Sequence, residues 1–398
     1  MFSKRLPWDE SGNALARLAA ERIRAGDQLI DLTESNPTRV ELAYPTAEIL
    51  AALTHPDAGR YDPAPLGLPA ARAAVAGDYA RRGARVSPEA VVLTASSSES
   101  YGMLLKLLCD PGDAVLVPEP SYPLFDYLTR LDGVEPRHYR LEPDCGWRID
   151  FASLAAAAAA RRLRAVVAVA PNNPTGSCLT AAELDRLGAF CVEHDAALVV
   201  DEVFADYRTP GRIAGGCDRV AAVLAHETAA LTFSLGGLSK SCGLPQLKLG
   251  WIAVGGPRGT AEAALARLEL IADTYLSVAA PVQLALPRLF ELGAGIRGQI
   301  RDRVAANRAI LAGAVGPASP CTLLPSEGGW SAILRVPAVR SDEAWALTLL
   351  REDGVLVHPG YFFDMPARAY LVPSLLSAPP QFGDGIGRLL ARCVRDSA

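Results

Sequence analysis

Four short segments contain residues that could bind an anion, polarise a ring or attack a carbonyl. In chain order they are Thr94-Ala95-Ser96-Ser97-Ser98-Glu99, Ala170-Pro171-Asn172-Asn173-Pro174-Thr175-Gly176, Val199-Val200-Asp201-Glu202-Val203-Phe204 and Ser234-Leu235-Gly236-Gly237-Leu238-Ser239-Lys240-Ser241. Each follows or closes a short apolar run that predicts a buried strand. Ligands of parallel α/β sheets bind at the carboxyl ends of the strands, so we expect the four segments to meet there.

Three of these segments suggest particular chemistry. The serines at 96–98 lie where a helix is expected to begin, and the free N–H groups of a helix start suit a phosphate. Asp201 ends an apolar strand, where a carboxylate needs a partner such as a protonated ring nitrogen. Lys240 lies among small residues, where desolvation would lower the pKa of its amine and make it a nucleophile toward a carbonyl. Singly, these residues also fit caps, turns or surface positions, so the hypothesis depends on their combination.

The intervening segments predict alternating strands and helices. Apolar runs without alternation, typical of strands buried on both faces, lie at 90–95, 114–118, 165–170, 197–200, 229–233 and 249–254. Helices are expected at 98–108 and 181–194, and Thr180 with Glu183 forms a capping-box pattern before the second. This order predicts an α/β fold with a mostly parallel central sheet flanked by helices.

The pattern changes beyond residue 280. Long helices are expected over 282–314 with a break at Gly293 and Gly295, followed by strands at 331–336 and 355–357 and a helix near 382–394. The 398 residues exceed the usual size of one hydrophobic core. We therefore expect an N-terminal segment (1–45) that joins a smaller α/β domain (291–398), and a large domain (46–290).

Composition excludes several classes of function. A formal net charge of −5 offers no basic face to nucleic acid. No run reaches the roughly 18 apolar residues of a membrane span, and the first residues lack the apolar stretch of a signal peptide, so we expect a cytoplasmic protein. The eight cysteines form no CxxC pair, and we expect no metal site.

Together the four segments resemble the class I/II aminotransferases, which are fold type I enzymes that depend on pyridoxal phosphate. The resemblance extends from Asn36 to about Leu376. It implies that Lys240 forms a Schiff base with pyridoxal 5′-phosphate, that Asp201 keeps the pyridine nitrogen protonated, and that Asn173 bonds the phenolate oxygen. The other cofactor contacts that it implies are Ser97, Ser98 and Lys248 at the phosphate, Tyr122 on the ring, and Tyr61 at the phosphate of the neighbouring subunit.

The same resemblance implies a homodimer with shared active sites. It also implies the reaction, in which an amino group moves between an amino acid, or an amine, and a keto acid. A β-eliminating lyase on the same scaffold remains an alternative, because it would share the cofactor machinery. A regulator of this fold would carry a DNA-binding domain, and an acyl-transferring synthase would show Asp-Glu-Ala-His where this chain has Asp-Glu-Val-Phe at 201–204.

Three positions depart from the family pattern. Phe204 stands where a tyrosine is usual, and Lys248 replaces an arginine, which loses the bidentate geometry. Val372 occupies the place of the arginine that pairs with the substrate carboxylate. A buried carboxylate needs positive charge or several donors, so we expect substrate contacts from Asn36, Arg39 or Arg368. Arg39 is the first choice because it follows a loop that could swing inward.

Overall fold

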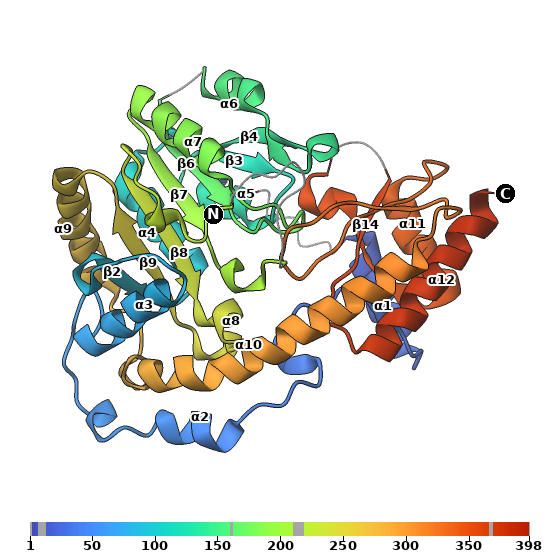
Figure 1. The fold of residues 1–398 in the computed structure, drawn as a ribbon, viewed down its shortest axis with the longest axis horizontal. Coiled ribbons are helices and arrows are strands. Elements are labelled where there is room, and N and C mark those ends of the chain that lie inside the picture. The colour runs from blue at the N-terminus through green and yellow to red at the C-terminus, as the bar shows by residue number, and fades with distance from the viewer. Residues whose placement is uncertain (1, 7–12, 160–161, 210–218, 366–368, 398) are drawn as a thin grey trace.

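The computed structural model describes residues 2–6, 13–159, 162–209, 219–365 and 369–397 (Figure 1). Its largest feature is an eight-stranded sheet in the order β2-β9-β8-β7-β6-β3-β4-β5. The five strands in the middle of this order, β8, β7, β6, β3 and β4, are parallel to their neighbours among them. Strand β9 is antiparallel to both β2 and β8, and β5 is antiparallel to β4. The bounds are β2 Val91–Thr94, β3 Ala114–Glu119, β4 Glu135–Glu142, β5 Arg148–Ile149, β6 Leu163–Val169, β7 Ala197–Asp201, β8 Thr232–Gly237 and β9 Gly250–Gly255.

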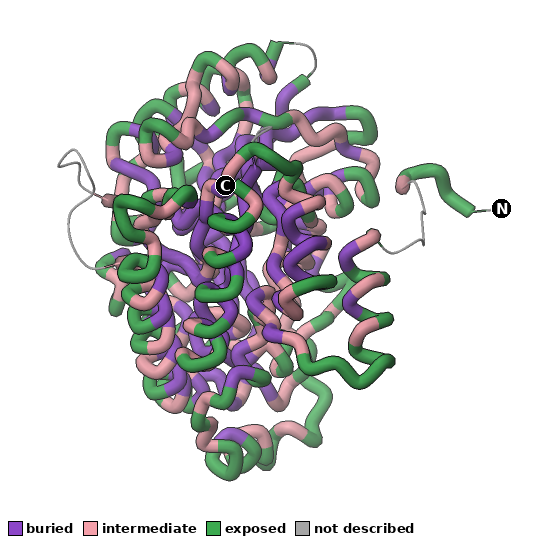
Figure 2. Tube along the Cα trace, turned by 90° about the vertical axis from the view of Figure 1, so that its right-hand side faces the viewer, coloured by how far each residue is buried: buried purple, intermediate pink, exposed green. Residues whose placement is uncertain are grey.

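Helices cover both faces of this sheet, as the alternating pattern predicted. One face packs on α4 (Ser97–Leu108), α5 (Leu124–Leu131) and α9 (Arg258–Tyr275). The other packs on α6 (Phe151–Ala158) and α7 (Ala181–Glu193), with α3 (Pro69–Arg81) beside β2. The predicted capping box is present at the start of α7. Buried residues therefore fill the interior between the layers, and exposed residues lie on the outer helices (Figure 2).

A smaller α/β part combines both ends of the chain. Strand β1 (Ile30–Asp31) pairs in parallel with β12 (Val355–Leu356), which confirms that the N-terminal segment joins the C-terminal region. A four-stranded sheet follows in the order β10-β11-β14-β13. Its strands are Thr322–Leu323, Leu334–Arg335, Tyr370–Val372 and His358–Pro359, and the surrounding helices are α1 (Ala14–Arg24), α11 (Asp342–Thr348) and α12 (Pro379–Ser397).

The expected helix break at Gly293 and Gly295 was wrong. Helix α10 runs without interruption over Ala280–Ala314, obliquely across the lower half of the molecule in Figure 1. Gly293 serves close packing instead, because a Cβ there would lie 2.5 Å from the Cβ of Cys242. The division of the chain at residues 45 and 290 stays a prediction, and α10 crosses the second of these positions.

Other differences concern strand ends and one missed strand. The expected strand at 331–336 is reduced to β11 and an isolated bridge from Ser331 to Ser374. The run at 229–233 enters the sheet only at Thr232. Strand β4, Glu135–Glu142, was missed because its sequence is mostly polar, and only two of its eight residues, near the sheet edge, are buried.

Candidate active site

The sheet order brings three of the four chemical segments together. Strands β6, β7 and β8 are adjacent and parallel, so the segments that follow them emerge at one edge of the sheet. Asp201 ends β7, Lys240 lies in the short helix α8 (Leu238–Ser241) after β8, and Asn173 lies in the turn after β6. The serine segment after β2 adjoins them across β9. This is the arrangement that the sequence predicted.

Asp201 is a buried carboxylate with two donors. Tyr101 donates its hydroxyl to Oδ2 at 3.1 Å, and the Val203 N–H donates to Oδ1 at 3.0 Å. Burial raises the pKa of Asp201 from 3.8 to about 6, and the two hydrogen bonds act in the opposite direction. A positive charge held against this carboxylate would offset the cost of burying it.

Lys240 offers an amine that is free to react. Burial lowers the pKa of Lys240 from 10.5 to about 8, while Asp201 acts in the opposite direction. Its Nζ lies 4.7 Å from the ring centroid of Trp330 and 5.5 Å from that of Phe204, and it makes no hydrogen bond within the described ranges. Tyr207 fixes the backbone here, because its hydroxyl donates to the Lys240 carbonyl at 2.6 Å. The backbone of Lys240 is therefore held in place, while no hydrogen bond to a described residue engages its amine.

The serine segment lies at the start of α4, where the sequence predicted a helix start that could bind an anion. Ser96 caps the helix and accepts the Glu99 N–H at 3.1 Å, while Ser97 and Ser98 are partly exposed in its first turn. A Cβ at Gly250 would lie 2.9 Å from the carbonyl carbon of Ser96, so a larger residue at 250 would push the serine segment aside. Lys248 is exposed in a left-handed conformation (φ 49°) two residues before β9.

The turn after β6 separates the two asparagines by role. Asn172 is buried and its Oδ1 accepts the N–H and hydroxyl of Thr175 at 3.4 and 3.1 Å. Among the residues that the structure describes, the Asn173 side chain has a single long hydrogen bond, in which its Oδ1 accepts from the Ser331 hydroxyl at 3.5 Å. Its Nδ2 is thus available to a ligand. Tyr122 follows Ser121, whose hydroxyl accepts from the Asn172 side chain at 3.5 Å, and Tyr122 is 48% exposed.

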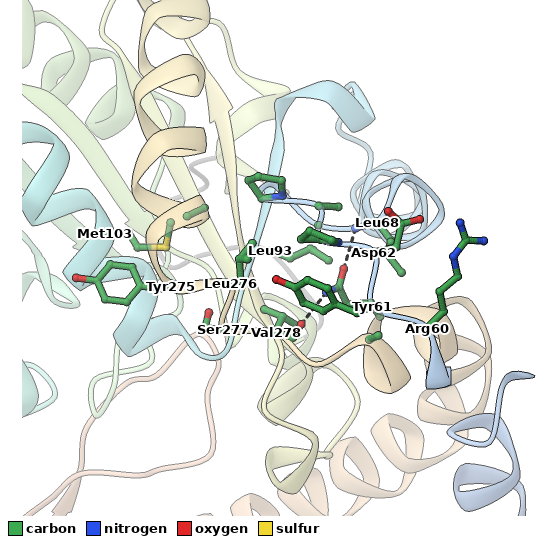
Figure 3. Close-up of a pocket in the computed structure, with 17 residues that line it drawn as sticks. Arg60, Tyr61, Asp62, Leu68, Leu93, Met103, Tyr275, Leu276, Ser277 and Val278 are labelled. Carbon is green, nitrogen blue, oxygen red and sulfur yellow. Dashed lines mark hydrogen bonds between the residues drawn. The ribbon is translucent and has the colours of Figure 1, made fainter. Parts of the chain in front are cut away.

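Tyr61 lies away from this cluster, in a surface pocket (Figure 3). It is 83% exposed. The pocket is also lined by Leu93, Met103 and Ser277, and the Ser277 hydroxyl donates to Glu99 at 2.7 Å. Tyr61 is therefore placed on a surface that adjoins the start of α4.

The expected substrate residues are only partly accounted for. The Asn36 side chain accepts from the N–H and hydroxyl of Thr38 at 3.0 and 2.8 Å, which commits its oxygen to the local turn. Arg39 has a side chain 74% exposed and lies 3.9 Å from Glu34. Arg368 lies outside the described residues. Val372 is buried in β14 and provides neither charge nor donor.

Sequence reasoning missed Tyr101 and Trp330. Tyr101 is separated from Asp201 by 100 positions, and no motif links the two. Trp330 follows two glycines, and a Cβ at Gly328 would lie 2.8 Å from the Tyr207 carbonyl. That Gly-Gly-Trp pattern was the available signal for a segment that approaches the site closely.

These residues fit pyridoxal phosphate. The buried carboxylate, the free amine of lowered pKa and the helix start match a protonated ring nitrogen, an aldehyde and a phosphate respectively. The fold and site thus define an α/β enzyme whose residues at one edge of the sheet fit pyridoxal phosphate.

Comparison with known proteins agrees with this reading. Residues 28–373 match the family model "Aminotransferase class I and II". The valine–pyruvate aminotransferase of Mycobacterium tuberculosis is 30% identical over 350 residues, which are 87% of this chain and 86% of that protein. Nicotianamine aminotransferase 1 of Oryza sativa is 30% identical over 237 residues, 58% of this chain, and the aligned part spans about half (46%) of that longer protein.

A solved aminotransferase from Escherichia coli has the same fold, with a TM-score of 0.85 at 23% identity over 99% of this chain and 98% of the other. The chain belongs to the class I and II aminotransferase family. It is a pyridoxal-phosphate-dependent enzyme of the aminotransferase class, and these findings give no support to the lyase alternative. Among the described helices, none has the length and apolar character needed to cross a membrane.

Proposed function

We propose that this enzyme moves an amino group between an amino acid and a keto acid, with Lys240 as the residue that binds the cofactor and carries the proton. The observation that supports this most directly is the buried Lys240 amine, whose pKa is lowered to about 8 and which interacts electrostatically with Asp201. When bound, pyridoxal phosphate supplies an electron-withdrawing ring that makes a Cα–H bond of the substrate acidic. A lysine amine of lowered pKa suits the removal and return of that proton near neutral pH.

The other residues would hold the cofactor in place. Asp201 would keep the proton on the ring nitrogen, because its buried carboxylate gains from a cation. Asn173 would donate its free Nδ2 to the phenolate oxygen, and Tyr122 would cover the ring. Ser97, Ser98 and Lys248 would bind the phosphate at the start of α4.

The partly exposed positions suit a shared site. We propose a cytoplasmic homodimer in which Tyr61 reaches the phosphate bound by the second copy, since Tyr61 is largely exposed beside the start of α4. Asn36 and Arg39 would contact the substrate from the N-terminal loop. That loop lies near the small sheet, because the Ser374 hydroxyl donates to the Glu34 carbonyl at 2.6 Å.

A half-reaction screen tests the function. Purified holoenzyme is mixed with single amino acids and amines, and the visible absorbance of the bound cofactor is followed without any keto acid. We expect one keto product per active site, and recovery of the original spectrum when a keto acid is added. Repeated formation of pyruvate and ammonia from a β-substituted amino acid, with no acceptor present, would overturn the transferase proposal.

A further inference from the structure

Strand β14 presents Val372 toward the site. Ser374, two residues beyond the end of β14, forms an isolated bridge with Ser331, whose hydroxyl donates to Asn173 Oδ1 at 3.5 Å. Val372 also belongs to the same buried cluster as Ala170, which directly precedes the asparagine turn. The position where the resemblance expects an arginine therefore faces the cofactor-binding turn.

His358 lies directly beside Val372. The two residues are register partners in the antiparallel pair of β13 and β14, so their side chains point to the same side of the small sheet. The imidazole ring lies 5.5 Å from the ring centroid of Phe362 and 5.8 Å from that of Phe363. The Phe363 carbonyl accepts the Ser121 N–H at 3.1 Å, which ties this aromatic pair to the residue before Tyr122. His358 thus lies in the edge strand of the small sheet, against an aromatic pair that contacts the segment before Tyr122.

The imidazole lacks a polar partner. It makes no hydrogen bond or ion pair to any residue in the described part of the chain, although it is half-buried among Val372 and two phenylalanines. Burial lowers the pKa of His358, while Asp31 acts in the opposite direction. A polar ring left unpaired in apolar surroundings is costly, and a bound anion would supply the missing acceptor.

We propose that His358 donates a hydrogen bond to the carboxylate of the substrate, at the place that the arginine would occupy if Val372 were one. This inference rests on the proposed function and names the carboxylate contact within the same site. The histidine side chain starts from β13, the strand paired with β14, and in its neutral form it offers one N–H donor. The site would then favour substrates with a carboxylate but hold it less tightly than a bidentate arginine does.

The matched variants His358→Phe and His358→Gln test the proposal. Phenylalanine keeps the aromatic packing on Phe362 and removes both ring nitrogens, whereas glutamine keeps an N–H donor. His194→Phe is the control, because His194 is also half-buried against a phenylalanine, Phe190 at 4.3 Å, but at the end of α7. Dissociation constants are read from the cofactor spectrum for an amino acid and for the amine formed by its decarboxylation.

We expect His358→Phe to weaken amino-acid binding roughly 10- to 100-fold, the scale of one hydrogen bond to a charged group, and to leave the amine unchanged. His358→Gln should lose less than His358→Phe, and His194→Phe should lose nothing. Equal losses for both ligands would reveal a general structural role and overturn the proposal, and so would an unchanged preference for the amino acid.

A second measurement does not depend on reaction. The chain has five histidines, so isotope labelling of histidine gives few imidazole signals, and His358→Gln identifies the relevant one. Titrating wild-type holoenzyme with propionate, an unreactive carboxylate, should shift that signal more than propanol does. No shift would overturn the His358 contact even if the enzyme transfers amino groups, whereas wild-type enzyme that reacts with no amino compound would overturn the proposed function itself.

Discussion

The substitution Asp201→Asn should stabilise the cofactor-free protein while it removes catalysis. The pKa of Asp201 is about 6 in the folded chain against an ordinary 3.8, a difference of about two units. At about 1.4 kcal/mol per unit, the ionised carboxylate destabilises the folded state by about 3 kcal/mol at pH 8. Because the folded-state pKa is the higher one, stability falls as pH rises from about 4 to 6, and the full penalty persists above that range. Asparagine does not ionise, so the folded state of the variant does not carry this electrostatic penalty.

Asparagine also keeps the local hydrogen bonds. Its Oδ1 can accept the Val203 N–H, and its Nδ2 can donate to the Tyr101 hydroxyl, which reverses its role. Urea unfolding of the cofactor-free proteins, followed by circular dichroism, measures the difference. We expect Asp201→Asn to be more stable by about 3 kcal/mol at pH 8 and by roughly half of that at pH 5.

Asp206 provides a control of opposite sign. It is as buried as Asp201, but it accepts from Arg81 at 2.8 Å and lies 3.7 Å from Arg297 and 3.6 Å from Arg301. Asp206→Asn should destabilise the protein by roughly 3 kcal/mol, because it leaves guanidinium groups without their anion. If Asp201→Asn were destabilising at pH 8, or if its effect did not depend on pH, the electrostatic reasoning would be refuted.

Three further predictions concern the cofactor and substrate. Borohydride reduction of holoenzyme should fix the cofactor on Lys240, located by mass spectrometry of peptides, and Lys240→Ala should abolish turnover; an adduct on another lysine would contradict the site. Phe204→Tyr adds a donor toward the phenolate oxygen, so the pKa in a spectroscopic titration of the bound cofactor should fall, and an unchanged or higher value would count against it. Arg39→Ala should weaken amino-acid binding by about 2 kcal/mol and spare the decarboxylated amine, and equal losses for both would exclude Arg39 as an anchor.

Much of the fold could be predicted because burial on both faces leaves a clear signal. The apolar runs that form β3, β6 and β7 contain few polar residues, so their strand pattern is clear. The turn residues that follow them mark the strand ends. Strand β4 could not be found in this way, because only two of its eight residues are buried and its sequence is mostly polar. Gly293 misled the prediction of α10, since a glycine that permits close packing has the same sequence signal as one that breaks a helix.

The site was predictable where one residue carries its own signal. Asp201 stands out because a charge at the end of an apolar strand requires an explanation, and Lys240 because it lies among small residues after such a strand. Tyr101 and His358 could not be recognised, because their roles come from strand order and register rather than from neighbouring residues. A histidine one strand away from Val372 becomes a candidate only when the pairing of β13 with β14 is known.

The pairing of β1 with β12 also constrains how the chain reaches its native state during synthesis. Ile30 and Val355 are 325 positions apart, so the N-terminal strand has no partner until most of the chain has left the ribosome. At roughly 5–20 residues per second this interval lasts about 16 to 65 seconds. The large sheet, whose strands all lie between Val91 and Gly255, has its full set of strands well before that. Maturation of the enzyme therefore ends with the closing of a long loop in the chain.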